Sequence, residues 1–267
     1  MLLNEQQLVS NINHTVVDVI ILSYAKNDHL KGLTEQTINT LLNSENQDNI
    51  QFNIIIIESN KNLKPFNYPN TTTLYPHVKF GFNKYINIGL KNCGNDFVCL
   101  CNNDLIFHQG WATNILSEFS KDQNLYSASP FCQFSQGAEG MPLNSGLYYG
   151  YTIRKEVSGW CIMLRRQTFQ IIGKPDNKFK FWYSDNDYAN LLKKHNLKHA
   201  LITSSFVDHI ESQTLLTKKE VDRKKLTYNE FLYYDYKWNH KNYFLYKVRL
   251  SKQNLFNRLR ALRNLFR

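Results

Sequence analysis

Short runs of β-branched and aliphatic residues alternate with helix-like segments in the first part of this 267-residue chain. Buried strands of parallel sheets have this composition, because helices cover both faces of the sheet. The pattern predicts strands over residues 16–22, 52–57, 75–80 and 96–101, and helices over 30–42 and 85–91. Such alternation favours an α/β fold with a mostly parallel sheet flanked by helices. No GxGxxG follows the first strand, which excludes a dinucleotide-binding enzyme of the Rossmann type.

The alternation continues in the second half of the chain after one interruption. Residues 129–151 are rich in Gly, Ser, Tyr and Pro, which indicates a loop region that covers the end of the sheet as a lid. Ser184 and Asp185 are expected to cap the helix that follows them. The elements predicted beyond the interruption are strand 157–165, helix 166–172, helix 187–195 and a last core strand over 199–206.

Polar residues follow three of the predicted strands at the point where each strand ends. These residues are Ser23 and Tyr24, Glu58 and Ser59, and the triplet 102–104, which reads Asn-Asn-Asp. In an open parallel sheet, ligands bind in the crevice beyond the carboxyl ends of the strands. The topology alone therefore predicts that these side chains converge on one crevice.

The cysteines favour a structural role in a reducing compartment. The chain has five cysteines and no CxxC pair. Cys99 and Cys101 alternate within one predicted strand, so both face the same side and are interpreted as small buried residues. Their spacing provides too few ligands for a zinc site. Unpaired thiols are typical of proteins kept in reducing surroundings.

The positive charge is concentrated at the C-terminal end. The net charge is +10, and no acidic residue follows Asp235, whereas nine Lys and Arg residues do. Leu255, Leu259, Leu262 and Phe266 are spaced by four, three and four residues, which predicts a basic amphipathic helix. We expect a tail over residues 217–267 that binds an anionic membrane surface or nucleic acid, or is simply solvated. The N-terminal residues lack the pattern of a signal peptide, and no apolar run has the length of a membrane helix, so any membrane contact is expected to be peripheral.

Five segments, in order and spacing, resemble the family-2 glycosyltransferases. They are VVDVIILSY, IIIIESN, the stretch from GFNKYIN to NNDLIFHQGW, the stretch from SGWCIMLRR to SDNDYANLLKKHNLKHA, and VDHIES, and together they extend over roughly residues 16–212. The resemblance implies a GT-A fold over residues 1–216. Its Asn-Asn-Asp variant is similar to the rhamnosyltransferase-like subgroup.

The resemblance implies a divalent cation, Mn²⁺ or Mg²⁺, and two protein ligands for it. Asn102, Asn103 and Asp104 match the family's Asp-X-Asp motif, in which a carboxylate at a strand end holds the metal against the donor diphosphate. Asp104 is the expected ligand, and Asn102 is an alternative contact to the ribose. His209 matches the second ligand, with Asp208 as its competing neighbour. Without the resemblance, a strand-end Asp capping a turn and an ordinary surface or core His would explain both residues.

The resemblance also implies a catalytic base. The segment 184–187, Ser-Asp-Asn-Asp, matches the family's acidic motif and departs from it at Ser184, where Glu is usual. Asp185 falls on the base that takes the proton of the acceptor hydroxyl, so that a single displacement inverts the anomeric carbon. Capping of the following helix is the structural alternative for Asp185, and more so for Asp187.

The remaining matched residues are assigned to the donor. Three of them, Ser23, Tyr24 and Glu58, sit at strand ends where the family contacts the nucleoside. Residues 25 and 26 are Ala and Lys, where the family usually has Asn and Arg. Trp160, Trp182 and Tyr183 are expected either to stack on sugar rings or to pack in the core. The expected donor-binding set is Ser23, Tyr24, Glu58, Gly81, Asn83, Asn102, Asn103, Gly159 and Trp160.

The sequence thus predicts a metal-dependent inverting glycosyltransferase of the cytoplasm, peripheral on the inner membrane face. Its expected partners are a nucleotide-diphospho-sugar donor and a saccharide or lipid-linked acceptor, in assembly of a surface polysaccharide or glycolipid. A DNA acceptor with a modified base is an alternative that rests on the basic tail. A non-catalytic nucleotide-sugar-binding relative is a second alternative, because Asn102, Asn103 and Ser184 depart from the acidic pattern.

Overall fold

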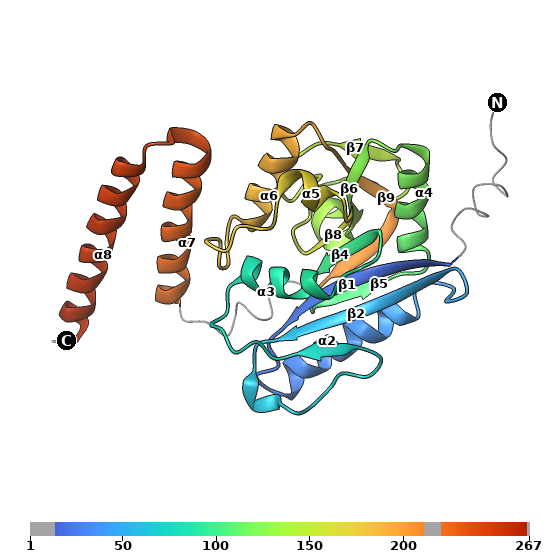
Figure 1. Cartoon of the computed structure of the whole chain (residues 1–267), viewed down its shortest axis with the longest axis horizontal. Coiled ribbons are helices and arrows are strands. Elements are labelled where there is room, and N and C mark those ends of the chain that lie inside the picture. The colour runs from blue at the N-terminus through green and yellow to red at the C-terminus, as the bar shows by residue number, and fades with distance from the viewer. Residues whose placement is uncertain (1–13, 211–219, 266–267) are drawn as a thin grey trace.

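A single nine-stranded sheet forms the centre of the molecule (Figure 1). The computed structural model describes residues 14–210 and 220–265. The spatial order is β3-β2-β1-β4-β8-β6-β9-β5, and β7 also pairs with β9. The strands are β1 (Thr15–Ser23), β2 (Ile50–Glu58), β3 (Thr72–Leu74), β4 (Phe97–Cys101), β5 (Leu105–Phe107), β6 (Leu125–Phe131), β7 (Leu147–Tyr149), β8 (Cys161–Arg165) and β9 (Lys198–His209).

Six of the nine strands run in one direction. β1 pairs in parallel with β2 and β4, and β2 with β3. β8 is antiparallel to both β4 and β6, so β6 regains the common direction, and β9 is parallel to β6. β5 and β7 are antiparallel to β9. The predicted mostly parallel α/β sheet is confirmed.

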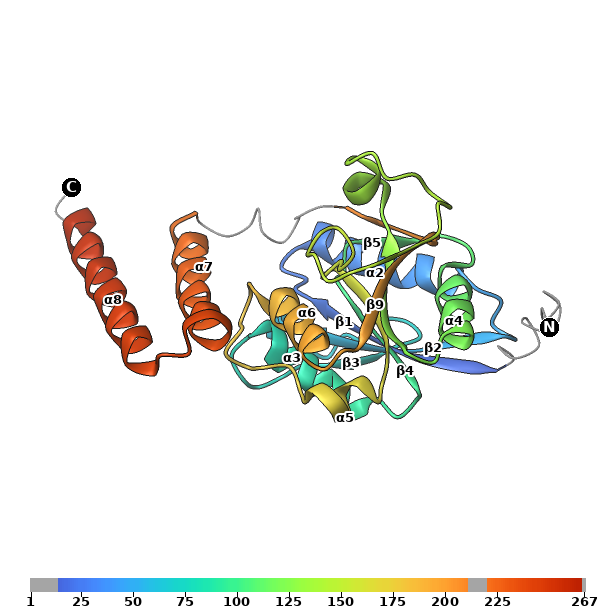
Figure 2. The same cartoon turned by 90° about the horizontal axis from the view of Figure 1, so that it is seen from above.

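Helices cover both faces of the sheet, as the apolar strands require. One core cluster joins the sheet to α2 (Asp28–Leu42) and α4 (Trp111–Lys121), and the other joins it to α3 (Phe82–Gly89), α5 (Thr168–Ile172) and α6 (Ser184–Lys194). Figure 2 shows α3, α5 and α6 grouped on one side. The short helical turns are η1 (Lys61–Leu63), η2 (Leu90–Asn92) and η3 (Gln133–Gly137). Residues 17–23 of β1 are all buried, because neighbouring strands and both helical layers enclose them.

Several predicted boundaries are wrong, and α3 begins at Phe82 instead of residue 85. The third strand lies at Thr72–Leu74, before the predicted 75–80, because Pro76 has no N–H for the ladder. β8 begins at Cys161, and Gly159 and Trp160 form a turn before it. α6 begins at Ser184, so Ser184 and Asp185 lie in its first turn, and Tyr183 is the N-cap instead. β9 extends to His209, which makes that residue part of the sheet edge.

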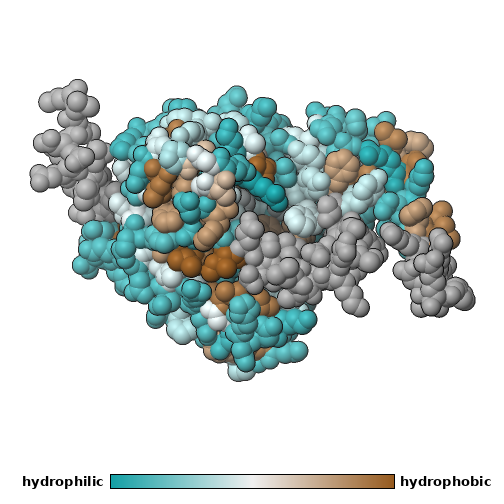
Figure 3. All heavy atoms as spheres, turned by 180° about the vertical axis from the view of Figure 1, so that it is seen from behind, coloured by the Kyte–Doolittle hydropathy of each residue, from teal (hydrophilic) through white to brown (hydrophobic). Residues whose placement is uncertain are grey.

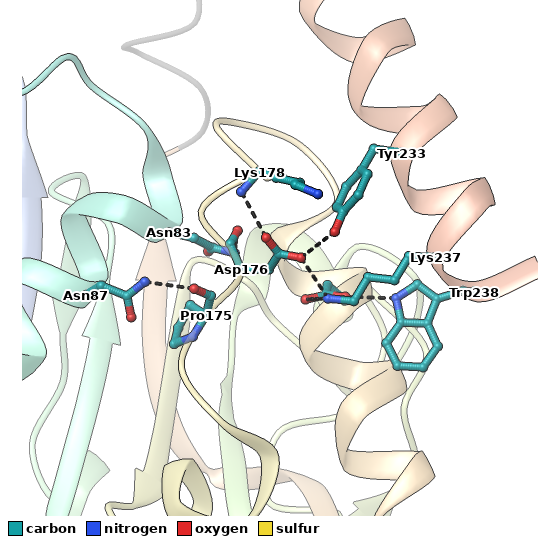
Figure 4. A network of polar contacts seen from close by, with 9 residues as sticks. Asn83, Asn87, Pro175, Asp176, Lys178, Tyr233, Lys237 and Trp238 are labelled. Carbon is teal, nitrogen blue, oxygen red and sulfur yellow. Dashed lines mark hydrogen bonds and ion pairs between the residues drawn. The ribbon is translucent and has the colours of Figure 1, made fainter. Parts of the chain in front are cut away.

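A helical hairpin follows the sheet domain and packs against the loop before α6. It consists of α7 (Glu220–Asp235), the turn η5 (Tyr236–His240) and α8 (Tyr243–Leu265). Residues 217–219, Phe266 and Arg267 of the predicted tail lie outside the described residues. The hydroxyl of Tyr233 donates to Asp176, and Lys237 forms ion pairs with Asp176 and Asp187 (Figure 4).

Trp238 completes this junction, since its indole N–H donates to Asp187 Oδ1 at 2.8 Å. On the other side of the same loop, Asn87 of α3 donates to the carbonyl of Pro175 (Figure 4). The loop is therefore held between α3 and the hairpin. No helix within residues 14–210 and 220–265 has both the length and the apolar character needed to cross a bilayer.

Three cysteines meet in the core. Cys99, Cys101 and Cys161 are buried, with Sγ–Sγ distances of 3.3, 3.7 and 3.9 Å. Cys101 and Cys161 lie opposite each other in the β4–β8 ladder, which explains the proximity. A structural zinc site takes four ligands, and the described residues offer three here. The thiols therefore pack as small core residues.

Candidate active site

The main pocket lies at the carboxyl ends of the parallel strands. Side chains after β1, β2 and β4 line it, together with His209 at the end of β9 and the segment 181–185 before and within α6. Nine of the twelve residues singled out from the sequence line this pocket. They are Ser23, Tyr24, Asn102, Asn103, Asp104, Gly159, Trp160, Asp185 and His209.

Asp104 and His209 form a pair of candidate metal ligands. The pairing of Leu105 with His209 in the β5–β9 ladder brings the neighbouring Asp104 to the end of β9. Asp104 Oδ1 lies 3.2 Å from His209 Nε2, and both residues are largely buried. Asp104 Oδ1 has no hydrogen-bond partner among the described residues, although it is buried. Two ligands at right angles, each about 2.1 Å from an ion, lie about 3 Å apart. A carboxylate oxygen and an imidazole nitrogen at this spacing fit Mn²⁺ or Mg²⁺.

Trp160 fixes the orientation of this pair. Its ring stacks on the His209 imidazole with centroids 5.4 Å apart and planes 15° from parallel. Its carbonyl accepts the backbone N–H of Asn102 at 2.9 Å. Asn102 Nδ2 in turn lies 3.4 Å from His209 Nε2. The turn before β8 therefore connects the Asn-Asn-Asp segment to the histidine.

Asp185 contacts the same turn from the other direction. A Cβ atom on Gly159 would lie 2.9 Å from Asp185 Cβ and 3.0 Å from its Oδ2, so only glycine leaves room for this carboxylate. The N–H of Asn186 donates to Oδ1 at 2.8 Å. Burial raises the pKa of Asp185 above its ordinary value, against the lowering effect of the Asn186 N–H and of Arg154. A carboxylate with a raised pKa is a stronger base than an exposed one.

The pocket contains polar atoms that the protein itself does not satisfy. Ser59 Oγ, Trp182 Nε1 and Ser184 Oγ line the pocket and are buried, and like Asp104 Oδ1 they have no hydrogen-bond partner among the described residues. A buried polar group without a partner costs about 1–3 kcal/mol. Their concentration on one pocket indicates a ligand that supplies the missing hydrogen bonds.

Asn103 has a different task from its neighbours in the triplet. Its amide donates to Thr34 Oγ1 at 2.9 Å, and that hydroxyl lies 3.0 Å from Ser23 Oγ. The residue thereby ties the end of β4 to α2 and to the end of β1. Asp208, the alternative to His209 as a metal ligand, does not line the pocket. Its side chain points to the opposite face of β9 and lies 3.0 Å from His108 Nε2.

Three residues predicted to bind the donor do not line the pocket. Glu58 is fully buried, and it accepts hydrogen bonds from Ser23 Oγ at 2.6 Å and from the N–H of Asn60 at 2.6 Å. Its oxygens are thus engaged inside the protein, and it acts on the pocket only through Ser23. Asn83 donates to the carbonyl of Asp176, and the N–H of Phe82, next to Gly81, donates to the carbonyl of Lys180, so this segment helps to hold the loop before α6.

Several lining residues were not predicted from the sequence. Phe80 and Ser158 lie near the ends of predicted strands, and Phe82, Arg154 and Phe181 lie between predicted elements, without a local pattern that marks them. Arg154 adopts a left-handed backbone conformation with φ of 70°, which is uncommon for a residue with a side chain. It is the one Lys or Arg among the described lining residues.

The segment 181–184 is held by the hairpin. One carboxylate oxygen of Glu230 in α7 accepts the backbone N–H groups of Phe181 at 3.0 Å and Trp182 at 2.7 Å. Tyr183 has a φ of 60°, and its ring stacks on Tyr234 of α7 with centroids 5.1 Å apart. A non-glycine residue in this conformation is strained, and such strain is typical of functional sites.

Comparison with known proteins supports the fold. No protein-family model matches the sequence, and no curated protein is similar to it in sequence. The crystal structure of GalNAc-T7 with UDP, GalNAc and Mn²⁺ has a TM-score of 0.57 at 13% identity, over 73% of this chain and 44% of the other. The mannosyltransferase PcManGT from Pyrobaculum calidifontis, in complex with GDP-Man and Mn²⁺, has a TM-score of 0.58 at 9% identity, over 81% and 61%.

The chain thus spans less than two thirds of the length of either structure. Both are glycosyltransferases, and the matched part contains a curled, mostly parallel sheet flanked by helices, as in this chain. The chain therefore has the GT-A fold of these glycosyltransferases.

Proposed function

We propose that this protein is a metal-dependent inverting glycosyltransferase, which moves a sugar from a nucleoside-diphosphate donor to an acceptor hydroxyl. The main support is that three residues far apart in the sequence, Asp104, Asp185 and His209, line one pocket. Two structures of the same fold contain UDP with Mn²⁺ and GDP-Man with Mn²⁺, which supports the donor class.

Asp104 and His209 hold Mn²⁺ or Mg²⁺ in this proposal. Bound there, the ion neutralises negative charge that develops on the departing nucleoside diphosphate. Trp160 keeps the His209 ring in place, and Asn102 lies close enough to contact the ribose or the diphosphate. Ser23 and Tyr24 line the part of the pocket next to β1, where the nucleoside binds.

Asp185 is the base. Its Oδ1 accepts the Asn186 N–H, which leaves Oδ2 for the acceptor hydroxyl. As the acceptor oxygen bonds to the anomeric carbon, its proton passes to Oδ2, and the carbon–phosphate-oxygen bond breaks with its electron pair on the diphosphate. Asp104 and Asp185 are the two carboxylates among the described lining residues. With Asp104 on the metal, Asp185 remains for proton transfer, so a single displacement with inversion is favoured.

The test is a nucleotide-release assay with a panel of UDP-, GDP- and deoxyhexose-nucleotide donors in the presence of Mn²⁺. The deoxyhexose donors are included because the Asn-Asn-Asp variant resembles the rhamnosyltransferase-like subgroup. Asp185→Asn is expected to lower transfer by about 10²–10⁴-fold, since this is what a general base contributes. Equal rates for wild type and variant would remove Asp185 from the mechanism.

A non-catalytic relative is the competing proposal, supported by Ser184 and by the two asparagines of the triplet. It predicts donor binding without release from any donor at any acceptor concentration. The stereochemistry is tested separately, by NMR of the product anomer. Retention of configuration would overturn the single displacement but not transferase activity.

We further propose that the acceptor is a saccharide or a lipid-linked saccharide, as in assembly of a surface polysaccharide or glycolipid. The aromatic side chains of Trp160, Trp182 and Tyr183 line the pocket and offer faces on which sugar rings stack. Lipid-linked and free oligosaccharide acceptors, compared at equal concentration, distinguish the two forms.

A further inference from the structure

The outer face of α8 presents an apolar stripe to solvent. Phe244, Val248, Leu255 and Leu259 are spaced by four, seven and four residues, and at 100° per residue they lie on one side of the helix. Their exposed fractions are 78%, 47%, 59% and 56%. Figure 3 shows apolar residues exposed on this hairpin between hydrophilic ones. An apolar surface left open over several turns indicates a binding site.

The opposite face of α8 is fixed against α7 and η5. Tyr246 stacks on Tyr236 with ring centroids 5.2 Å apart, and Arg249 pairs with Asp235. Tyr246 and Arg249 lie on the side of α8 away from the stripe. Because these contacts fix the rotation of α8, the stripe cannot turn inward to be buried.

The charge around the stripe is positive. Lys247 and Lys252 are both exposed and lie on opposite borders of the stripe, by the same helical geometry. Nine basic residues and no acidic one follow Asp235 in the sequence. Basic residues beside an apolar face are complementary to an anionic bilayer surface. The apolar side chains contact the acyl chains, and the basic side chains contact the negative headgroups.

We propose that α8 lies in the interface of an anionic lipid bilayer, with Phe244, Val248, Leu255 and Leu259 among the acyl chains and Lys247 and Lys252 at the headgroups. Two other occupants suit the stripe less well. Duplex DNA offers phosphates for the lysines but only water or charge for four apolar side chains. A second copy of the chain would bring its own positive charges against these, which is repulsive.

Surface binding by α8 also determines where the pocket lies relative to the bilayer. α8 is fixed to α7, and Glu230 of α7 holds the backbone of residues 181 and 182 beside the pocket. The pocket is therefore attached to the surface-bound helix through two described sets of contacts. The lipid-binding proposal does not depend on the transferase reaction, and it is tested without a donor sugar.

The experiment is co-sedimentation of the full chain with phosphatidylcholine vesicles, with and without phosphatidylglycerol, across a salt series. We expect binding to the mixed vesicles, weakened by salt, and little binding to phosphatidylcholine alone. Leu255→Asp/Leu259→Asp is expected to weaken binding more than tenfold, since burial of two leucines is lost. Phe134→Asp is the matched control, because Phe134 is 61% exposed on the sheet domain, away from the hairpin. It is expected to bind like wild type.

Circular dichroism and thermal melting show whether the double variant retains its fold, and Lys247→Glu/Lys252→Glu provides a second variant that leaves the stripe intact. Charge reversal is expected to weaken binding to the mixed vesicles at low salt. The proposal is overturned if the double variant, folded, binds mixed vesicles like wild type. Binding to a DNA duplex without binding to the mixed vesicles also overturns it, and favours a nucleic-acid partner.

Discussion

The pocket and the helical hairpin meet at residues 181–184, but different forces hold them. The strand ends that form one side of the pocket belong to a sheet that is buried on both faces, so the register of the ladders fixes Asn102 to Asp104 beside His209. The hairpin contacts the sheet domain through polar groups, chiefly of Glu230, Lys237 and Trp238, and through the stacking of Tyr234 on Tyr183. The side of the pocket with Asp104 and His209, the metal side, is therefore set by the sheet. The side with Asp185, the base side, depends on the hairpin.

The largest effect is expected on the metal side. Removal of Mn²⁺ by chelation is expected to lower transfer about 10³-fold, because a bound metal supplies several kcal/mol of transition-state stabilisation. Asp104→Asn is expected to act similarly and to weaken Mn²⁺ binding, measured by calorimetry. Its melting temperature should change little, since Asp104 Oδ1 has no hydrogen-bond partner to lose among the described residues. Unchanged Mn²⁺ affinity in this variant would show that the ion binds elsewhere.

The next effect is at the contact between the two sides. Gly159→Ala is expected to displace Asp185, since the added Cβ would lie 2.9 Å from the Cβ of the aspartate. A base misplaced by about 1 Å costs roughly 10² in rate, with much less effect on Mn²⁺ binding. Gly32→Ala is the control, because no atom lies within 4 Å of its new Cβ. Lost Mn²⁺ affinity in Gly159→Ala would contradict the separation of the two sides.

The difference between the sheet side and the hairpin side of the pocket also explains which residues could be predicted from the sequence. β-branched runs that end in polar residues mark buried strands and their ends, so Ser23 and the triplet 102–104 were found as local patterns, whereas His209 was assigned by resemblance. The base Asp185 was assigned by resemblance, and the sheet then explains why Gly159 must be beside it. The prediction of a strand over 75–80 failed because a short apolar run is compatible with both a strand and a loop, and the observed strand is Thr72–Leu74.

Long-range contacts could not be predicted. Glu58 has the sequence position of a ligand-binding residue, yet Ser23 and the Asn60 N–H occupy its oxygens from 35 and two residues away. Arg154 lies in a loop without periodicity. Glu230 is one of four acidic residues in α7, and only the fold shows that it accepts two N–H groups beside the pocket.

A smaller effect is expected where the hairpin holds the pocket. Glu230→Gln replaces the charged acceptor of two N–H groups, and such hydrogen bonds contribute about 1.5–3 kcal/mol. We expect about a tenfold loss of kcat/KM for the acceptor, with donor and Mn²⁺ affinity unchanged. Asp235→Asn is the control, because its partners Asn239 and Arg249 lie within the hairpin. Equal losses in both variants would mean that the hairpin acts as one unit and that Glu230 has no specific role.

The smallest effect is a difference in pH dependence between the two regions. Burial raises the pKa of Asp185, whereas hydrogen bonds from Asn239 and Arg249 lower the pKa of Asp235 in the hairpin. As the pH falls, Asp185 is therefore protonated first, at a pH above the ordinary value of an aspartate. The stabilisation from Asp235 is present above its unfolded pKa and is lost only as the pH falls through its lowered folded pKa.

An interval of pH should thus exist in which the base is protonated while the contact of Asp235 with Arg249, which joins α7 to α8, is intact. Within it we expect kcat at saturating Mn²⁺ to fall a few-fold, while the helical circular dichroism remains constant. Simultaneous loss of activity and of helical circular dichroism would indicate that opening of the hairpin, and not protonation of Asp185, limits transfer at low pH. The side of the pocket with Asp185 would then need the hairpin in order to remain folded, and not only to orient its residues.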